Sequence, residues 1–310
     1  MHAIAITDFG AAPALIDVPE PTPEPGEVLV RVRASSVNGF DLAVVGGMLK
    51  GLMQHRFPVV FGKDFAGTVA TAGGEVSGFA AGDEVFGVIT KPFLDDGSMA
   101  GYVSAGTGPG LAPIPAGLSM AAAGTLGLAG TAALDTVQAI APALGESVVV
   151  AGATGGVGAF ATQLAAAPGA RVIATAKPGT EADFVLGLGA AHTADYAGDL
   201  AAQVRAIAPG GVDAVLHFAG DAAQLASLLV SGGRFASTLG ADRDAVGLPD
   251  VTVTAIMAAP DQAALDQFGA DAAAGRLRVP ITRTYPLAEV PQALADFAAG
   301  TLGKLAISIG

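Results

Sequence analysis

The fold of this chain is decided by the stretch Val148-Val149-Val150-Ala151-Gly152-Ala153-Thr154-Gly155-Gly156-Val157-Gly158. Four apolar residues predict a buried strand, and the glycines after them predict a tight turn into an uncharged helix. Gly155 and Gly156 would let a pyrophosphate approach the helix N-terminus, and Gly158 would let the helix pack closely on the strand. Ala153 replaces the first glycine of the usual pattern. An ordinary tight turn also carries glycine, but the strand and helix around this one favour a dinucleotide site.

Short strands and helices alternate around this loop from about residue 119 onward. Six strands are expected, at residues 147–151, 171–176, 192–195, 213–218, 233–239 and 251–257. Helices are expected between them, including 157–166 and 181–188, the second with Thr180 as its N-cap. Strands joined by helical crossovers form a parallel sheet. The expected fold class is therefore α/β, with a doubly wound six-stranded parallel sheet of the Rossmann type.

The residues before this region have a different pattern. Residues 1–118 contain short strands separated by turn residues, as in 27–34, where Val28, Val30 and Val32 alternate with Leu29, Arg31 and Arg33. Residues 262–310 return to β character, with strands expected at 281–285 and 305–309. Three segments follow: a β-rich domain at 1–118, the nucleotide-binding domain at 119–261, and a return to the first domain at 262–310.

Composition excludes several classes of function. The 310 residues carry a net charge of −13, which repels nucleic acid and anionic lipid surfaces. The chain has no Cys, so disulfides, thiol nucleophiles and thiolate zinc sites are excluded. Its four His are not at ligand spacing, and no metal site is expected.

Membrane insertion is not expected either. Two uncharged stretches, 97–134 and 147–170, are long enough to test against a bilayer, but Gly and Pro interrupt the first and Gly the second. The N-terminus has no basic segment of the kind that precedes an export signal. A cytoplasmic location is therefore expected.

The residues after the second strand of this sheet indicate which dinucleotide binds. An NAD site usually carries an acid there to hold the ribose hydroxyls, but this strand ends Thr175-Ala176-Lys177-Pro178. Lys177 can instead meet a ribose phosphate, which favours NADP(H), although it can also be an ordinary solvated lysine. Glu181 and Asp183 follow at the start of the next helix and would repel a phosphate.

Several ordered phrases carry a resemblance that covers nearly the whole chain. They lie at 26–32, 36–41, 57–67, 82–87, 128–132, the Gly152 loop, 188–190 with Tyr196, and 303–305. In these phrases the chain resembles the medium-chain dehydrogenase/reductase superfamily, in its zinc-independent quinone oxidoreductase (zeta-crystallin-like) branch. The resemblance implies a GroES-like catalytic domain, a Rossmann domain that binds NADPH, and a homodimer. The edge strand near 251–257 is the expected dimer contact.

The resemblance also suggests the chemistry. Zinc-dependent relatives have Cys where Asn38 stands, His where Lys63 stands and a second Cys near Gly127, so this chain lacks their ligands. It implies a metal-independent reductase that passes hydride to a small-molecule quinone or an α,β-unsaturated carbonyl. Asn38 is the first candidate for the donor to the developing oxyanion, Asp41 shapes the pocket, and Lys63 is a cationic alternative.

Each of these three residues also has a structural interpretation. Asn38 can shape a turn beside Gly39, Asp41 can cap a helix, and Lys63 can pair with Asp64. Some relatives carry tyrosines after this segment, whereas Leu42-Ala43-Val44-Val45 follows here, which favours a smaller or aliphatic enone. A protein that binds NADPH with little catalysis is the alternative function.

The remaining candidate residues would contact the cofactor. The resemblance places Thr131 near the nicotinamide, Tyr196 near the adenosine phosphate and Lys304 beside the nicotinamide ribose. Residues at strand ends line such sites, although simple turn geometry is an equal interpretation for Gly220 and Gly240. The full expected set is Thr131, Gly152, Thr154, Gly155, Gly156, Val157, Gly158, Thr175, Lys177, Tyr196, Phe218, Gly220, Leu239, Gly240 and Lys304.

Overall fold

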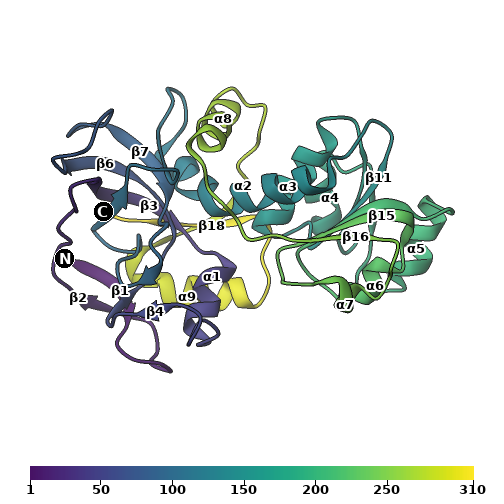
Figure 1. Ribbon diagram of the computed structural model, residues 1–310, viewed down its shortest axis with the longest axis horizontal. Helices are drawn as coiled ribbons and strands as arrows, with labels where there is room; N and C mark the ends of the chain where they lie inside the picture. The colour runs from purple at the N-terminus through teal and green to yellow at the C-terminus, as the bar shows by residue number, and fades with distance from the viewer. The chain divides into compact units, whose positions relative to one another are not determined.

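The two ends of the chain belong to the same unit of the structure. A computed structural model that describes residues 1–310 divides into two units, which we call unit 1 and unit 2. Unit 1 contains Met1–Leu128 and Pro260–Gly310, and unit 2 contains Ala129–Ala259. Figure 1 shows the elements of both.

Unit 2 is built on a six-stranded sheet in the order β13-β12-β11-β14-β15-β16. All of its strand pairs are parallel, which confirms the expected fold class. The central strand, β11, is buried at all five of its positions because both of its faces are covered. The strands are β11 (Ser147–Ala151), β12 (Arg171–Thr175), β13 (His192–Ala194), β14 (Val212–His217), β15 (Leu229–Ser237) and β16 (Thr252–Ala255).

Helices cover both faces of this sheet (Figure 1). The residues of α5 and α6 that face the sheet join a core with Val149, Ile173 and Val215. Asp199 and Asp221 cap these two helices by accepting the backbone N–H three residues on. The helices that contribute to unit 2 are α2 (Met120–Ile140), α3 (Gly156–Ala166), α4 (Thr180–Leu186), α5 (Leu200–Ile207), α6 (Ala222–Ala226) and α7 (Arg243–Val246).

The N-terminus of α4 differs from the sequence prediction by one residue. Gly179 is the N-cap, and Thr180, which was expected to cap the helix, is its first helical residue. Gly179 has a φ of +87°, a conformation that a threonine would rarely adopt. The chain can therefore turn sharply after Pro178 and begin α4 at once.

Unit 1 is mainly β-structure, as its short alternating segments predicted. Its largest sheet has the order β10-β7-β6-β3-β18-β17, with β9 also paired to β3. Val28, Val30 and Val32 of β3 point into the core, as the alternation predicted. The strands are β1 (His2–Ile6), β2 (Ala14–Asp17), β3 (Glu27–Ser36), β4 (Gln54–His55), β5 (Val59–Val60), β6 (Asp64–Ala72), β7 (Glu84–Val88), β8 (Phe93–Leu94), β9 (Tyr102–Gly106), β10 (Leu111–Pro113), β17 (Ile281–Pro286) and β18 (Lys304–Ser308).

The C-terminal segment completes this sheet. Strand β18 lies between β3 and β17, antiparallel to the first and parallel to the second. It is buried from Lys304 to Ile307. The helical elements of unit 1, besides the start of α2, are α1 (Gly39–Val45), α8 (Gln262–Ala273), the 3₁₀ helix η1 (Leu287–Glu289) and α9 (Val290–Ala298).

The start of α2 packs within unit 1. A Cβ atom at Gly124 would lie 2.8 Å from Ala34 Cβ, and one at Gly127 would lie 2.9 Å from Asp64 Oδ1. Both glycines therefore let the helix approach unit 1 closely. The Leu128 N–H also donates to Asp64 Oδ1 at 2.6 Å. These contacts explain why unit 1 extends to Leu128, whereas the change in sequence pattern placed the boundary at residue 118.

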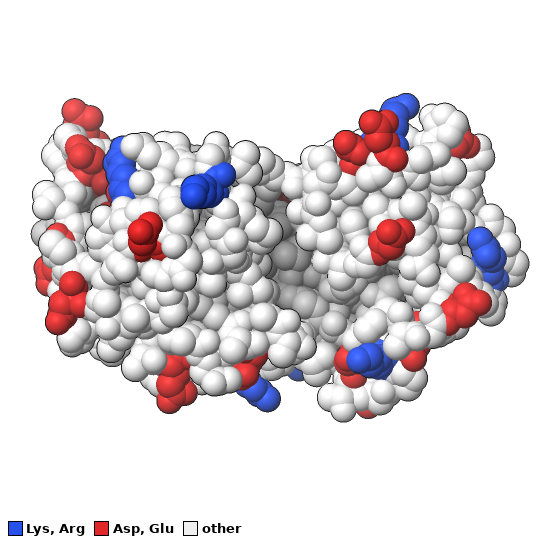
Figure 2. Space-filling model, turned by 90° about the horizontal axis from the view of Figure 1, so that it is seen from below, with Lys and Arg blue, Asp and Glu red and all other residues white.

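Charged side chains are sparse on the surface. Figure 2 shows one face, on which acidic residues outnumber basic ones, in agreement with the 28 Asp and Glu against 15 Lys and Arg of the chain. None of the helices combines the length and the apolar character that crossing a bilayer requires.

Candidate functional site

The glycine loop joins β11 to α3, and its glycines have different tasks. Gly152 has a φ of +82°, which starts the turn. A Cβ at Gly158 would lie 2.1 Å from Gly152 O, so only glycine lets α3 pack against the loop. A Cβ at Gly155 would meet only Gly152 O, at 3.5 Å. The protein's own packing therefore does not require glycine at 155.

This loop leaves the N-terminus of α3 accessible to a ligand. Gly155 is the N-cap and supplies no side-chain cap for the first N–H groups of the helix. Thr154, Gly156 and Val157 beside it are partly exposed. Backbone N–H groups, the positive end of the helix dipole and the space at Gly155 suit a pyrophosphate. The residues present thus fit the phosphates of a dinucleotide.

Thr175 supports this loop from behind. Its Oγ1 accepts a hydrogen bond from the Gly152 N–H at 2.9 Å, and the residue is 3% exposed. This hydrogen bond therefore links the end of β12 to the start of the glycine loop.

Three side chains meet just beyond the end of β12. The Lys177 ammonium lies 5.2 Å from the centroid of the Tyr196 ring. The Tyr196 hydroxyl donates a hydrogen bond to Glu181 Oε1 at 3.1 Å, and the backbone N–H of Lys177 donates one to Glu181 Oε2 at 2.8 Å. The structure thus brings together the expected base, the expected tyrosine and the acid that the sequence placed nearby.

The other candidates in unit 2 lie after β14 and β15 or inside α2. Gly220 and Gly240 have φ values of +94° and +74°, as turns require. The carboxyl ends of β11, β12, β14 and β15 share one edge of the parallel sheet, where such folds bind ligands. Phe218 and Leu239 follow β14 and β15 at this edge, and Leu239 is 57% exposed. Thr131 lies within α2 and is buried.

Unit 1 contains a second group of polar residues, which are buried. Asp64, at the start of β6, accepts hydrogen bonds from Ser36 Oγ at 2.5 Å and from Asn38 Nδ2 at 2.9 Å. Its other oxygen accepts the Leu128 N–H. Lys304 Nζ lies 3.4 Å from Asp64 Oδ2 and 2.6 Å from Asn38 Oδ1. We call Ser36, Asn38, Asp64 and Lys304 the buried polar cluster.

Asn38 is held on both sides of its amide. Its oxygen accepts from Lys304, one amide hydrogen goes to Asp64, and the other makes only a long contact of 3.4 Å with Ser36 O. The residue is 6% exposed and is the N-cap of α1. The turn that the sequence suggested as an alternative role is therefore present, together with a fixed amide orientation.

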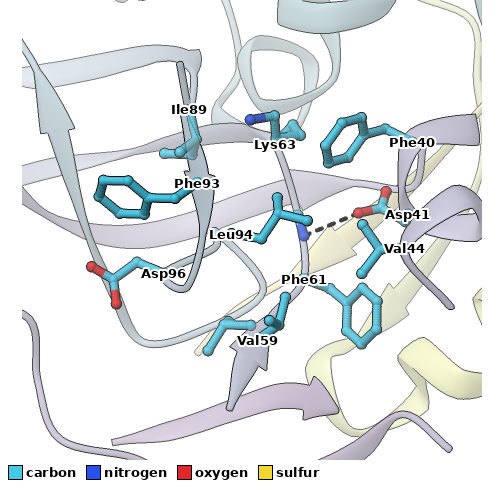
Figure 3. A pocket seen from close by; sticks show the side chains of 12 residues that line it. Phe40, Asp41, Val44, Val59, Phe61, Lys63, Ile89, Phe93, Leu94 and Asp96 are labelled. Atoms are coloured by element: carbon cyan, nitrogen blue, oxygen red, sulfur yellow. Dashed lines mark hydrogen bonds between the residues drawn. The ribbon is translucent and has the colours of Figure 1, made fainter. Parts of the chain in front are cut away.

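Asp41 is buried at the first turn of α1. Its carboxylate accepts the Asn38 N–H at 2.8 Å and the Gly62 N–H at 3.1 Å, the second drawn in Figure 3. Burial raises the pKa of Asp41 from 3.8 to about 6, although these two backbone hydrogen bonds oppose the shift. Asp41 thus helps to cap α1 and ties it to the Gly62 turn.

Lys63 lines a narrow pocket that lies wholly within unit 1 (Figure 3). Its ammonium lies 4.9 Å from the centroid of the Phe40 ring. Burial lowers the pKa of Lys63, while the charges of Asp41 and Asp64 oppose this shift. Asp64 pairs with Lys304 and not with Lys63, so the suggested Lys63–Asp64 ion pair is absent. The pocket also has apolar walls, formed by Phe40, Val44, Val59, Phe61, Ile89, Phe93 and Leu94.

The sequence did not single out Ser36 or Asp64 as site residues, and it placed Lys304 beside a cofactor ribose. In the structure Lys304 is 1% exposed and its ammonium is directed into the buried polar cluster. One signal could have revealed the cluster. Asp64 opens a strand with no other charged residue, and its first four positions are buried, so the acid needs a buried partner.

Known proteins share both units of this chain. The alcohol dehydrogenase GroES-like domain family matches residues 24–133, and the zinc-binding dehydrogenase family matches residues 188–307. The chain is 32% identical over 231 residues to a chloroplast envelope quinone oxidoreductase homolog of Arabidopsis thaliana, a match that covers 71% of this chain and 68% of that protein. It is 29% identical over 328 residues to a quinone oxidoreductase of Lama guanicoe, with 99% and 97% covered.

A solved structure agrees with this likeness over the full length. The quinone oxidoreductase from Coxiella burnetii superimposes with a TM-score of 0.91 at 27% identity, and the match covers 100% of this chain and 99% of that one.

Proposed function

This chain belongs to the medium-chain dehydrogenase/reductase superfamily, in its quinone oxidoreductase-like branch, and we propose that it is an NADPH-dependent, metal-independent reductase of a quinone or an α,β-unsaturated carbonyl. The proposal depends on the loop before α3. Packing within the protein does not require glycine at position 155, and the space that Gly155 leaves open suits a pyrophosphate. Membership of the superfamily makes the protein an oxidoreductase with a nicotinamide nucleotide. The form of the nucleotide and the substrate are the proposed part.

The binding of the nucleotide divides among three groups of residues in unit 2. The N-terminus of α3 would hold the pyrophosphate, with Thr175 keeping the loop in place. Lys177 and Tyr196, which lie after β12 and β13, would hold the ribose phosphate that distinguishes NADPH. The residues that follow β14 and β15 would complete the site at the same sheet edge.

When bound, the nicotinamide supplies the hydride, so the protein must bind and orient the substrate and stabilise negative charge on its carbonyl oxygen. Lys63 is the cation of the unit 1 pocket, and its ammonium makes no hydrogen bond there. It is therefore free to donate a hydrogen bond to a substrate oxygen. The Asn38 amide hydrogen that makes only the long contact with Ser36 O is the candidate for a second donor, with the amide kept in its fixed orientation. The carboxyl group of Asp41 keeps α1 and the Gly62 turn together beside them.

The character of the pocket supports a small, largely apolar substrate. Aromatic and aliphatic side chains form most of its walls, which favours an uncharged group, and the free space of about 10 Å³ would admit only the end of a substrate. The missing Cys ligands and Lys63 in place of a His support reduction without a metal. The free edge of β16 in the sheet order supports a homodimer.

One observation favours the alternative, a protein that binds NADPH with little catalysis. The Asn38 amide already makes hydrogen bonds with Lys304 and Asp64, which gives it a structural role that needs no substrate.

The deciding experiment follows NADPH absorbance against a panel of quinones and short enals, with NADH in parallel and EDTA as a control for metal. We expect oxidation of NADPH that EDTA does not affect, and weaker oxidation of NADH. Binding of NADPH without turnover of any compound would favour the alternative, and loss of activity in EDTA would refute metal independence. Lys177→Ala should weaken NADPH more than NADH, and equal affinities in the unmutated protein would refute the NADPH preference.

A further inference from the structure

Glu181 already occupies two of the donors that lie at the expected ribose site. Its Oε2 accepts a hydrogen bond from the backbone N–H of Lys177 at 2.8 Å, and its Oε1 accepts one from the Tyr196 hydroxyl at 3.1 Å. Glu181 is the second residue of α4 and is only partly exposed, so these contacts fix its carboxylate beside the end of β12. The acid that dinucleotide sites for NAD carry at this place is therefore present, although it comes from the following helix.

The same place also holds a base. The Lys177 side chain is exposed and lies over the Tyr196 ring, and no ion pair joins it to Glu181. The two charges therefore do not neutralise each other in a direct contact. A carboxylate accepts hydrogen bonds from ribose hydroxyls, whereas an ammonium attracts a phosphate.

We propose that Glu181 sets the choice between the two nucleotides and lets this site accept NADH beside NADPH. Its carboxylate accepts hydrogen bonds from the ribose hydroxyls of NADH. It repels the 2′-phosphate of NADPH and competes with it for the Tyr196 hydroxyl. Lys177 supplies the opposite preference, so NADPH binds better but only by a modest margin. This inference rests on the proposed binding of a nicotinamide nucleotide and not on the identity of the substrate.

The test compares dissociation constants of NADPH and NADH, measured by isothermal titration calorimetry, for the unmutated protein and Glu181→Gln. Glutamine keeps an oxygen that can accept the Lys177 N–H, so the start of α4 is preserved while the charge is lost. We expect NADPH to bind about tenfold more tightly. NADH should bind about threefold more weakly, because a neutral amide accepts hydroxyl hydrogen bonds less strongly.

Asp183→Asn is the matched control. Asp183 lies two residues further along α4, is exposed and makes no side-chain hydrogen bond or ion pair, so this change removes the same charge without touching Tyr196 or Lys177. The ratio of the two dissociation constants should change by less than about twofold. An equal change in both variants would show that only overall charge matters and would overturn the inference.

Two further outcomes are distinguishable. If Glu181→Gln leaves the ratio unchanged while thermal unfolding shows an intact fold, the inference is wrong even if the protein reduces quinones. If the unmutated protein binds both nucleotides but reduces no substrate, the proposed reductase function fails and the inference stands. If Glu181→Gln does not fold, Glu181→Asp replaces it. The shorter side chain keeps the charge but moves it away from Tyr196. The ratio of the two dissociation constants should again shift in favour of NADPH. An unchanged ratio there would also overturn the inference.

Discussion

The Nζ atom of Lys304 lies 2.6 Å from Oδ1 of Asn38, although 266 positions separate the two residues in the chain. The ammonium also contacts the Val37 carbonyl oxygen and Asp64, and burial lowers its pKa, while Asp64 opposes the shift. Lys304 is thus the counter-charge that allows Asp64 to be buried within unit 1.

Replacing Lys304 by methionine should therefore destabilise unit 1. The change leaves Asp64 without its cation in a site that is 0% exposed, and breaking a buried pair in this way costs about 3–5 kcal/mol. The unfolding free energy from urea titration measures the loss. The double variant Lys304→Met with Asp64→Asn removes both charges and should recover part of it. A single variant within about 1 kcal/mol of the unmutated protein would contradict the role of Lys304.

Asp41 should make the stability of the protein depend on pH. Its pKa is about 6 in the folded state against 3.8 as the ordinary value, so the folded protein holds a proton that the unfolded chain releases between these values. Stability therefore falls as pH rises through this window, by roughly 3 kcal/mol in total, and this contribution is flat above it.

Asp41→Asn separates this effect from the titration of other carboxylates. Urea titrations at pH 4, 5, 6 and 7 should show that the unmutated protein loses stability relative to the variant as pH rises. Parallel profiles for the two proteins would mean that Asp41 titrates normally.

Lys63 should matter for turnover more than for folding. Lys63→Met removes the cation of the pocket and should lower kcat by about 10²-fold, the cost of losing one donor to a developing oxyanion. Lys50→Met is the control, because Lys50 also lies over a phenylalanine, Phe9, but does not line the pocket.

The pH profile gives a second measure of the role of Lys63. Because burial lowers its pKa, activity should decline on the alkaline side before pH 10.5, and Lys63→Met should lack this decline. A variant with the kcat of the control would rule out a catalytic role for Lys63.

Two glycines of the same loop should respond differently to alanine. Gly158→Ala places a methyl group 2.1 Å from Gly152 O and should lower the unfolding temperature of unit 2. Gly155→Ala meets only ordinary contacts, so the fold should be kept, while NADPH should bind at least about tenfold more weakly because the methyl group fills the space for the pyrophosphate. Calorimetry measures the unfolding temperature of each variant, and titration measures its affinity for NADPH. Normal NADPH affinity in Gly155→Ala would place the phosphates elsewhere.

The sheet of unit 2 could be predicted because its signals are local. The central strands are short apolar runs that end in a turn, and the observed strand β11 coincides with the predicted residues 147–151. The glycine loop follows directly from such a strand, so its position and its glycines needed no knowledge of distant contacts.

The buried polar cluster could not be predicted in the same way. Asn38 and Asp64 are 26 positions apart, and their common partner Lys304 comes from β18, far along the chain. Nothing near Lys304 in the sequence shows that its strand is inserted beside β3. The contacts of the Lys304 side chain therefore depend on the order of strands in the sheet, whereas the family resemblance implied only a place beside the nicotinamide ribose.

The insertion of β18 between β3 and β17 also has a consequence for biosynthesis. Unit 2 is continuous in sequence, so all of its strands have been synthesised before residue 260 is made. Unit 1 cannot close its main sheet until Lys304–Ser308 has emerged, and until then the last residues of β3, Ala34–Ser36, lack their partner strand. We therefore expect the order usual in multidomain chains to be reversed here, with the second unit folding during translation and the first unit completed last.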